Sequence, residues 1–464
     1  MLMSSVTSND LLESPVLKSA IRKAVARLLP MLVILYVIAF LDRTNVGFAQ
    51  AGLGTDRAVS AGAFALGAGI FFIGYAIFEI PSNLMLKRVG AKFWLARIAI
   101  TWGIVAACFM FVQGERSFIF LRFLLGVTEA GLFPGVIMFL AAWFPNKVRV
   151  QIFAIFYLAQ PLSQMVGAPL SGMLINLGEK MPGIAGWQLM FLTEGLLAVL
   201  AGAAAFFFLI NGPQDAKFLT PAEKTALLDV MALEDTVRVE SGPSGVWAAL
   251  RNGRVWYFTV VYFCLQIAVY GVTFFLPQQV AELTGQKVGL KVGLLVAIPW
   301  FFAIFSTYFI GRKATTMTRR RNLGIWLFVS TGLCIFGSAW AGTNHLPVIG
   351  IVLITLAVSS FLAVGPITWS YPTAFLTGTA AAAGIGLINS LGNLGGFVAP
   401  ILRTQVNVLA NSPTGSAGVY ALGVLPFLAA LLMYGTKWLK TRADDLLDAE
   451  VQVERRDPEV ALIP

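Results

Sequence analysis

Apolar residues fall into long runs along most of the chain, and short polar segments separate these runs. A run of about 20 apolar residues crosses the roughly 30 Å hydrocarbon core of a bilayer as an α-helix. The chain has twelve such runs, at about 28–52, 64–86, 93–113, 117–141, 149–177, 187–210, 254–282, 289–311, 322–342, 346–369, 372–405 and 417–439. The pattern therefore predicts an all-α integral membrane protein with twelve transmembrane helices.

A long polar segment, residues 211–253, lies between the sixth and seventh runs and divides the chain into two halves of six helices. The predicted parts are an N-terminal tail (1–27), a six-helix bundle (28–210), a linker (211–253), a second six-helix bundle (254–440) and a C-terminal tail (441–464). Within the linker, Thr220, Pro221 and Glu223 form a helix-start signal. We expect an amphipathic surface helix there.

Lysine and arginine residues gather in connections that share one side of the membrane if the helices alternate in direction. The clusters are Lys18, Arg22, Lys23 and Arg27; Lys87, Arg88 and Lys92; Lys147 and Arg149; Arg312, Lys313, Arg319, Arg320 and Arg321; and Lys437, Lys440 and Arg442. Basic residues mark cytoplasmic connections, so both termini are predicted to be cytoplasmic. The polar stretch 1–27 is too long for a secretory signal, and we expect the first helix to be retained.

The composition agrees with a membrane protein and excludes several other classes. Hydrophobic residues make up 58% of the chain and charged residues 12%, with a mean hydropathy of +0.79. The net charge of +10 is spread over short clusters rather than one face, so no nucleic-acid partner is expected. Cys108, Cys264 and Cys334 lie far apart inside apolar runs and are expected to be inert thiols. No nucleotide-binding, hydrolase, metal or redox motif occurs, so we expect no enzyme, no ATP-driven pump and no cofactor.

The two halves carry related polar motifs in their fifth helices. Residues 160–170 read QPLSQMVGAPL and residues 389–400 read NSLGNLGGFVAP. Gln160 and Asn389 each lie seven residues before a glycine, Gly167 and Gly396, and a proline follows a few residues later. Paired halves with interrupted helices are typical of secondary carriers, which bind substrate at the repeat interface.

Charged residues inside the predicted helices are the most informative feature, because each must face the bundle interior or water. Asp42 and Arg43 stand side by side in the first helix, within LDRTNVGFAQ, and Arg122 and Glu129 lie in the fourth. Arg122 and Glu129 are two helical turns apart and share a face, which leaves room for a partner between them. Asp42 is the natural candidate. The four residues are then either a static ion network or a proton relay.

Other polar side chains at membrane depth are Tyr75, Gln160, Gln164, Gln266, Trp369, Ser370, Asn389 and Asn393. Each can act as a hydrogen-bonding link between helices, and together they can line one central cavity. Arg43 is then the fixed positive charge of that cavity. Because a guanidinium forms a planar fork that matches a carboxylate, the expected substrate is a small organic anion. Glu79, near the cytoplasmic end of its helix, is expected to act in gating or packing rather than in substrate contact.

Four stretches resemble the major facilitator superfamily: LDRTNVGFA, GIFFIGYAIFEIPSNLMLKRVGAK, LRFLLGVTEAGLFPG and GWQLMFLTEG. Within it, residues 25 to 440 resemble the anion:cation symporter family of bacterial organic-acid carriers. The resemblance implies that Arg43 binds the substrate carboxylate, and that Tyr75, Gln160 and an asparagine of the eleventh helix line the pocket. It also implies that Asp42 and Glu129 couple to protons, with Arg122 as the cation between them. Gln266 and Ser370 match the pocket by position.

The sequence thus predicts a multi-pass protein of the bacterial plasma (inner) membrane. The expected function is import of a small organic anion together with protons by alternating access. A sugar acid, a hydroxy-dicarboxylate and an aromatic carboxylate all fit as substrates, and the protein is expected to be monomeric. Two other functions stay open: an exporter or antiporter of a drug or metabolite, and a transporter-like membrane sensor that binds ligand without moving it.

Overall fold

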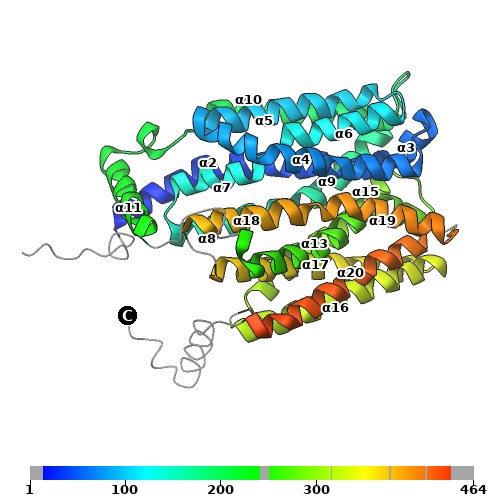
Figure 1. Cartoon of the computed structure of the whole chain (residues 1–464). Coiled ribbons are helices and arrows are strands. Elements are labelled where there is room, and N and C mark those ends of the chain that lie inside the picture. Colours follow the sequence, from blue (N-terminus) through cyan, green and yellow to red (C-terminus); the bar gives the residue numbers. More distant parts are fainter. Residues whose placement is uncertain (1–13, 241–249, 315, 376–377, 413–414, 440–464) are drawn as a thin grey trace, which may run out of the picture. The chain divides into compact units, whose positions relative to one another are not determined.

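A computed structural model of the chain describes residues 14–240, 250–314, 316–375, 378–412 and 415–439. Within these ranges the chain is helical (Figure 1). The predicted C-terminal tail, the first 13 residues of the N-terminal tail and residues 241–249 of the linker lie outside the described residues.

The described residues divide into two units. The first comprises 14–240 with 287–294 and 378–380, and the second comprises 250–286, 295–375 and 381–439. The first unit holds the helices α2 (Pro15–Thr44), α3 (Val46–Arg57), α4 (Ala61–Val89), α5 (Ala91–Cys108), η1 (Phe109–Phe111), α6 (Glu115–Glu129), α7 (Leu132–Trp143), α8 (Asn146–Tyr157), α9 (Ala159–Gly178), α10 (Gly186–Phe208), η2 (Pro213–Asp215) and α11 (Pro221–Glu240).

The second unit is built from a similar succession of helices. They are α13 (Gly253–Thr273), α14 (Leu276–Thr284), most of α15 (Leu290–Gly311), α16 (Met317–Thr343), α17 (Pro347–Phe375), most of α18 (Gly378–Asn393), α19 (Gly395–Leu409), α20 (Ser416–Gly435) and η3 (Thr436–Leu439).

Eleven helical segments of the described chain are long and apolar enough to cross a membrane. They coincide with the predicted runs, and the run predicted at 149–177 is the one not among them. The structure places α8 and α9 there. The predicted run is helical, and α9 carries Gln160, Ser163, Gln164 and Ser171 among its buried residues.

Several of the predicted transmembrane runs contain an irregular point, although the backbone at Asn45, Leu158 and Leu394 stays in the right-handed helical region. Breaks occur at Asn45 between α2 and α3, at 130–131 between α6 and α7, at Leu158 between α8 and α9, and at Leu394 between α18 and α19. At the second break, Gly131 has a φ of +88° and a Cβ there would collide with Ser82, so only glycine fits. Broken helices in membranes are tolerated where they line a site, and the polar residues singled out from the sequence lie beside these breaks.

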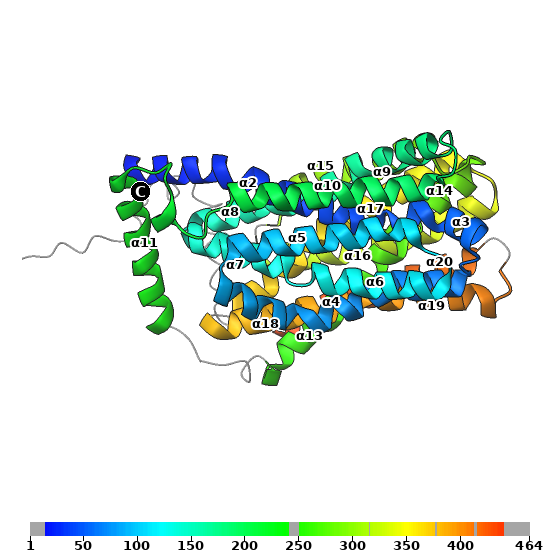
Figure 2. The ribbon, with the colours of Figure 1, turned by 90° about the horizontal axis from the view of Figure 1, so that it is seen from above.

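Small residues let the helices of the first unit approach closely. The helices α4 and α6 lie side by side (Figure 2). A Cβ at Gly126 would clash with the backbone carbonyl of Phe71, and one at Gly74 would meet the carbonyl of Phe123 at 2.5 Å. Such contacts between backbones are typical of helix packing in membranes. They hold the ring of Phe71 next to the charged residues of α6.

The predicted linker helix forms as α11 and packs against the N-terminal part of α2. Thr220 and Glu223 form the expected cap, because the Thr220 N–H donates to Glu223 at 2.9 Å and the Glu223 N–H donates to the Thr220 hydroxyl at 3.3 Å. Glu223 also pairs with Lys23 at 2.7 Å and accepts a hydrogen bond from the Ser19 hydroxyl at 2.7 Å. The linker is thereby fastened to the first transmembrane helix.

Candidate functional site

Four consecutive buried polar residues, Asp42, Arg43, Thr44 and Asn45, lie at the junction of α2 and α3. Because successive side chains leave a helix about 100° apart, four of them point around the whole circumference. Each one contacts a different helix of the first unit. The partners are Trp102 of α5 for Asp42, Glu129 of α6 for Arg43, Gln164 of α9 for Thr44, and Glu194 of α10 for Asn45.

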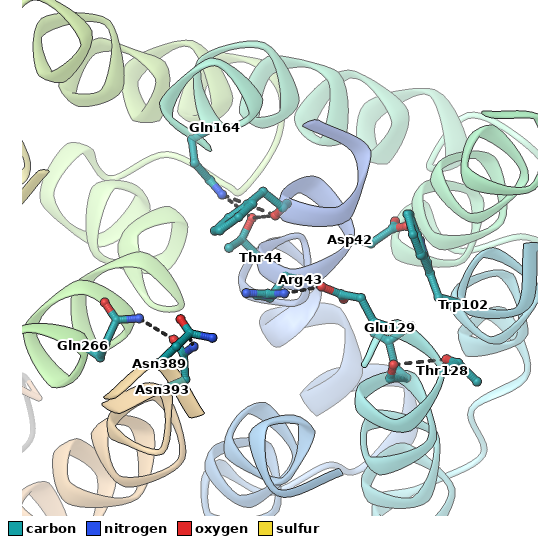
Figure 3. A network of polar contacts seen from close by, with 12 residues as sticks. Asp42, Arg43, Thr44, Trp102, Thr128, Glu129, Gln164, Gln266, Asn389 and Asn393 are labelled. Carbon is teal, nitrogen blue, oxygen red and sulfur yellow. Dashed lines mark hydrogen bonds and ion pairs between the residues drawn. The ribbon is translucent and has the colours of Figure 1, made fainter. Parts of the chain in front are cut away.

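Arg43 forms the central ion pair of this junction. Its Nη2 donates to the carboxylate of Glu129, and Arg43 is 8% exposed while Glu129 is fully buried (Figure 3). Three aromatic rings surround the guanidinium, with their centroids at 4.8 Å (Phe40), 5.1 Å (Phe71) and 5.5 Å (Tyr75) from Cζ. Stacking against aromatic faces stabilises a cation while leaving its edge available for hydrogen bonds.

Arg122 is fully buried on the same helix as Glu129, but within the described residues the two form no ion pair at hydrogen-bonding distance. Its Nε donates to the carbonyl of Gly67 at 3.1 Å and its Nη2 to that of Ala68 at 3.2 Å. Its Cζ lies 5.4 Å from the ring centroid of Phe71, the same ring that Arg43 approaches. Arg122 is therefore held in place by the backbone of α4, as a positive charge in a fixed position.

The expectation that Asp42 lies between Arg122 and Glu129 is wrong. Asp42 accepts a hydrogen bond from Trp102 Nε1 at 2.8 Å, and Arg43 is the residue of α2 that reaches Glu129 (Figure 3). The 100° step between neighbouring residues is the physical reason, since only one of them can face α6. Asp42 Oδ1 and Glu129 Oε2 are buried without a hydrogen-bond partner in the described part of the chain. Both carboxyl groups thus keep one oxygen free.

The other residues predicted in the first unit lie close to this junction in the sequence or the structure. Tyr75 stacks beside Arg43, as described above. Gln160 is 9% exposed on α9, one turn before Gln164. The amide of Gln164 donates to Thr44 Oγ1 at 2.6 Å (Figure 3). Glu79, expected near a helix end, is buried at 4% exposure within α4.

In the second unit the structure brings three of the predicted residues together. Gln266 Nε2 donates to Asn393 Oδ1 at 2.7 Å, and Asn393 Nδ2 donates to Asn389 Oδ1 at 3.1 Å (Figure 3). Ser370 donates to the carbonyl of Ile367 in its own helix at 2.7 Å, and Trp369 meets Tyr262 edge-to-face at 4.8 Å. A row of amides on α13 and α18 is the chemistry that binds hydroxyl and carbonyl groups.

Sequence reasoning missed two buried charged residues. Glu194 of α10 is fully buried and accepts hydrogen bonds from Asn45 and Ser171, at 2.7 Å each. Arg403 of α19 is 8% exposed, and its Cζ lies 4.2 Å from the ring centroid of Phe275. The intramembrane position of each residue was the available signal, since Glu194 stands in GWQLMFLTEG and Arg403 near the end of the eleventh run.

The ranges that the structure describes contain no cluster of side chains that could bind a metal ion. No group of three or more His, Cys, Asp or Glu side chains there is placed to hold an ion. The three cysteines are free thiols, and Cys264 and Cys334 are buried. The described charged site can act through ion pairing, hydrogen bonding and proton exchange.

The family follows from a comparison of the whole sequence with known families. Residues 32–400 match the model of the Major Facilitator Superfamily. The chain belongs to this superfamily. It is therefore a multi-pass membrane protein of a transporter family, in which the buried charges of α2 and α6 lie inside a helical bundle.

Named relatives cover nearly the whole chain. The inner membrane transport protein RhmT of Escherichia coli K12 is 41% identical over 93% of this chain and 98% of that protein. A protein of Agrobacterium vitis named "Putative tartrate transporter" is 41% identical over 92% of each chain. The quinolone resistance transporter of Acinetobacter baumannii is 35% identical over 90% of this chain and 94% of that protein.

Solved structures show the same fold at low sequence identity. The partially occluded inward-open form of the xylose transporter XylE from E. coli superposes with a TM-score of 0.68 and 14% identity. The match covers 89% of this chain and 98% of XylE. The predicted fold class, two six-helix bundles of the major facilitator type, is therefore confirmed.

Proposed function

We propose that the protein imports a small organic anion together with protons, and that Arg43 is the residue that binds the substrate carboxylate. The observation that carries the proposal is the buried ion pair of Arg43 and Glu129 within a ring of aromatic side chains. A guanidinium is the best-matched side chain for a carboxylate. In the absence of substrate, the carboxylate of Glu129 occupies the place that a substrate carboxylate would take.

Exchange of partners at Arg43 would link substrate binding to proton uptake. When a substrate carboxylate pairs with Arg43, Glu129 is left in an apolar site without its cation. A buried carboxylate without a partner is costly, and protonation removes the charge. Arg122 already donates to the carbonyls of Gly67 and Ala68, so in this proposal Arg43 is the cation whose departure leaves Glu129 in need of a proton. The carrier would thus load an anion and a proton together.

Asp42 is the second proposed proton acceptor. It is 1% exposed and accepts one hydrogen bond, from the indole N–H of Trp102. A neutral donor does not balance a full negative charge, so Asp42 also gains from binding a proton. Two protons matter because an inside-negative potential opposes anion entry by roughly 2.3 kcal/mol per charge at 100 mV. Two protons would more than offset one monovalent anion.

A hydroxylated or aromatic organic acid is the proposed substrate class. In the second unit, Gln266, Asn389 and Asn393 form a row of amides of the kind that binds hydroxyl groups. Tyr75, Phe40 and Phe71 supply apolar faces beside the carboxylate-binding cation. The relative named for tartrate supports a hydroxy-dicarboxylate in particular, and the name of RhmT supports an inner-membrane location. The proposed import by alternating access would expose Arg43 to each side of the membrane in turn.

Uptake into proteoliposomes with an inward proton gradient tests the proposal. The panel contains labelled sugar acids, hydroxy-dicarboxylates and aromatic acids, and the variants are Arg43→Ala and Arg116→Ala. Arg116 is an exposed arginine at the start of α6, so its loss controls for net charge. Gradient-driven accumulation of one acid, lost in Arg43→Ala and kept in Arg116→Ala, is the expected result. Equal uptake by wild type and Arg43→Ala would refute the assignment of Arg43.

Export of a drug or metabolite is the second candidate function, and the quinolone resistance relative favours it. It makes the opposite prediction in the same vesicles. With the same inward proton gradient, proton entry would drive a fluoroquinolone out of the vesicle lumen, and no acid would accumulate inside. Binding of an acid without movement in either direction would indicate a sensor.

A further inference from the structure

Glu194 is a buried carboxylate that joins three helices. It lies in α10 with no exposed surface, and each of its oxygens accepts one hydrogen bond. Oε2 accepts from Asn45 Nδ2 at 2.7 Å, and Oε1 accepts from the Ser171 hydroxyl of α9 at 2.7 Å. Within the described residues, no Lys or Arg lies at ion-pair distance from it. Its contacts are therefore directional hydrogen bonds rather than charge neutralisation.

Asn45 is the residue at which α2 ends and α3 begins. It stands two residues after Arg43 and three after Asp42, so a shift of Asn45 moves both. Asn45 keeps a helical backbone (φ −57°, ψ −24°), and its N–H donates to the Leu41 carbonyl at 2.9 Å, so the junction is a local irregularity within one span. A contact with a neighbouring helix at such a point helps to set the direction in which the chain continues. Glu194 supplies that contact on the side of α10, while Gln164 binds Thr44 on the side of α9.

The helix α9 holds the junction through two of its residues. Gln164 and Ser171 are seven positions apart and so lie on one face of α9. Gln164 contacts the junction directly at Thr44, and Ser171 reaches it through Glu194. We propose that Glu194 is a positioning residue, which fixes the α2–α3 junction and thereby holds Arg43 in the orientation that binds the anion. This inference rests on the proposed role of Arg43 in anion binding.

The variants separate a positioning role from a role of the charge itself. Glu194→Ala removes both hydrogen bonds, and Asn45→Ala and Ser171→Ala remove one each. Glu194→Gln removes the charge but can keep both links, because the Asn45 amide can turn to accept from the new NH2 group while Ser171 donates to the new carbonyl. Ser163→Ala is the matched control. It also removes a hydrogen bond from α9 to α2, the 2.6 Å bond to the Val37 carbonyl, but at a distance from the junction.

The first measurement is the KM and maximal rate of proton-driven anion uptake. We expect Glu194→Ala and Asn45→Ala each to raise KM about fivefold to tenfold, a size typical of lost positioning contacts, with a smaller change in maximal rate. The double variant should be no worse than the poorer single one, because both break the same link. Glu194→Gln should stay within about twofold of wild type. Additive effects of the two alanine changes, or a loss in Glu194→Gln as large as in Glu194→Ala, would overturn the inference.

The second measurement is hydrogen exchange of peptides that cover residues 40–48, which needs no knowledge of the substrate. Exchange should be faster in Glu194→Ala than in wild type and unchanged in Ser163→Ala. Unchanged exchange in Glu194→Ala would overturn the positioning role even if uptake fell. Faster exchange in that variant, with no uptake of any acid by wild type, would instead refute the proposed function and leave Glu194 as the residue that fastens the junction.

Discussion

Arg43 and Glu129 form an ion pair between α2 and α6 inside the first helical unit. Arg122, seven residues before Glu129, donates instead to two backbone carbonyls of α4. Breaking a buried ion pair leaves an uncompensated charge and costs about 3–5 kcal/mol. Opening the pair is therefore favoured when something else neutralises both groups, and in the proposed mechanism an anion and a proton together would do so.

Glu129→Gln removes the internal competitor for Arg43. We expect anion binding to be retained or to tighten by up to about tenfold, which corresponds to roughly 1.4 kcal/mol. Accumulation driven by a proton gradient should be lost, while exchange of labelled for unlabelled anion continues. Counterflow and gradient-driven uptake in the same proteoliposomes measure the two activities. Glu179→Gln, at the exposed end of α9, is the control. Loss of both activities in a folded Glu129→Gln protein would contradict the proton role.

The succession of helices could be predicted from the sequence because apolar runs of bilayer length are a strong local signal. The helix α9 shows the limit of that signal, since its run is not among the eleven segments of the described chain that are long and apolar enough to cross a membrane. The helix breaks at Asn45 and Leu394 were not predicted as boundaries. The sequence on each side of Asn45 and of Leu394 is compatible with a continuous helix. Whether the helix becomes irregular there depends on its contacts with other helices.

The partners within the site could be predicted only in part. The shared face of Arg122 and Glu129 follows from their spacing, but which of Asp42 and Arg43 reaches Glu129 depends on the rotation of α2. The position of Glu194 inside a predicted membrane helix was a signal, but its contacts were not predictable because its partners, Asn45 and Ser171, lie 149 and 23 residues away in the chain. No local pattern connects residues that far apart.

Arg122 should act on stability more than on substrate affinity. Its two hydrogen bonds to α4 carbonyls are charge-assisted, and bonds of that kind contribute about 1.5–3 kcal/mol each. Arg122→Lys cannot reproduce the fork, so we expect a loss of about 2 kcal/mol in the free energy of unfolding. Thermal unfolding in detergent measures the change, with Arg116→Lys as an exposed control. An unchanged unfolding temperature would show that the two hydrogen bonds from Arg122 to the Gly67 and Ala68 carbonyls contribute nothing to stability.

The contact of the linker with α2 should be insensitive to pH across the physiological range. Hydrogen bonds from Lys23, the Thr220 N–H and Ser19 lower the pKa of Glu223 from 4.5 to about 2. A lowered pKa means that the contribution to stability is fully present above about pH 4.5 and is lost as the pH falls through about 2. The contact therefore stays intact between about pH 5 and 8.

Glu223→Gln tests this contact directly. The difference in unfolding temperature between wild type and Glu223→Gln should be constant from about pH 8 to 5 and shrink at lower pH. Asp229→Asn, on the exposed face of the same helix, should show no such difference. A gap that changed between pH 8 and 6 would contradict the assigned contacts of Glu223.

Arg403 and Phe275 provide a test of how a buried cation is stabilised in the second unit. In the described part of the chain Arg403 has no ion-pair partner, and its guanidinium lies over the Phe275 ring at 4.2 Å. A desolvated cation–π contact contributes about 2 kcal/mol. Phe275→Leu should therefore lower the free energy of unfolding by about 2 kcal/mol in addition to the loss caused by the smaller side chain's poorer packing.

In an Arg403→Met background this extra loss should disappear, because no cation remains to be stabilised. The two single variants and the double variant form a thermodynamic cycle, read by thermal or denaturant unfolding in detergent. Arg403→Met alone should be neutral or stabilising, since replacing a buried charge by an apolar side chain removes its desolvation cost. A strongly destabilised Arg403→Met protein, or additive effects of the two changes, would show that the cation is held by contacts other than the Phe275 ring.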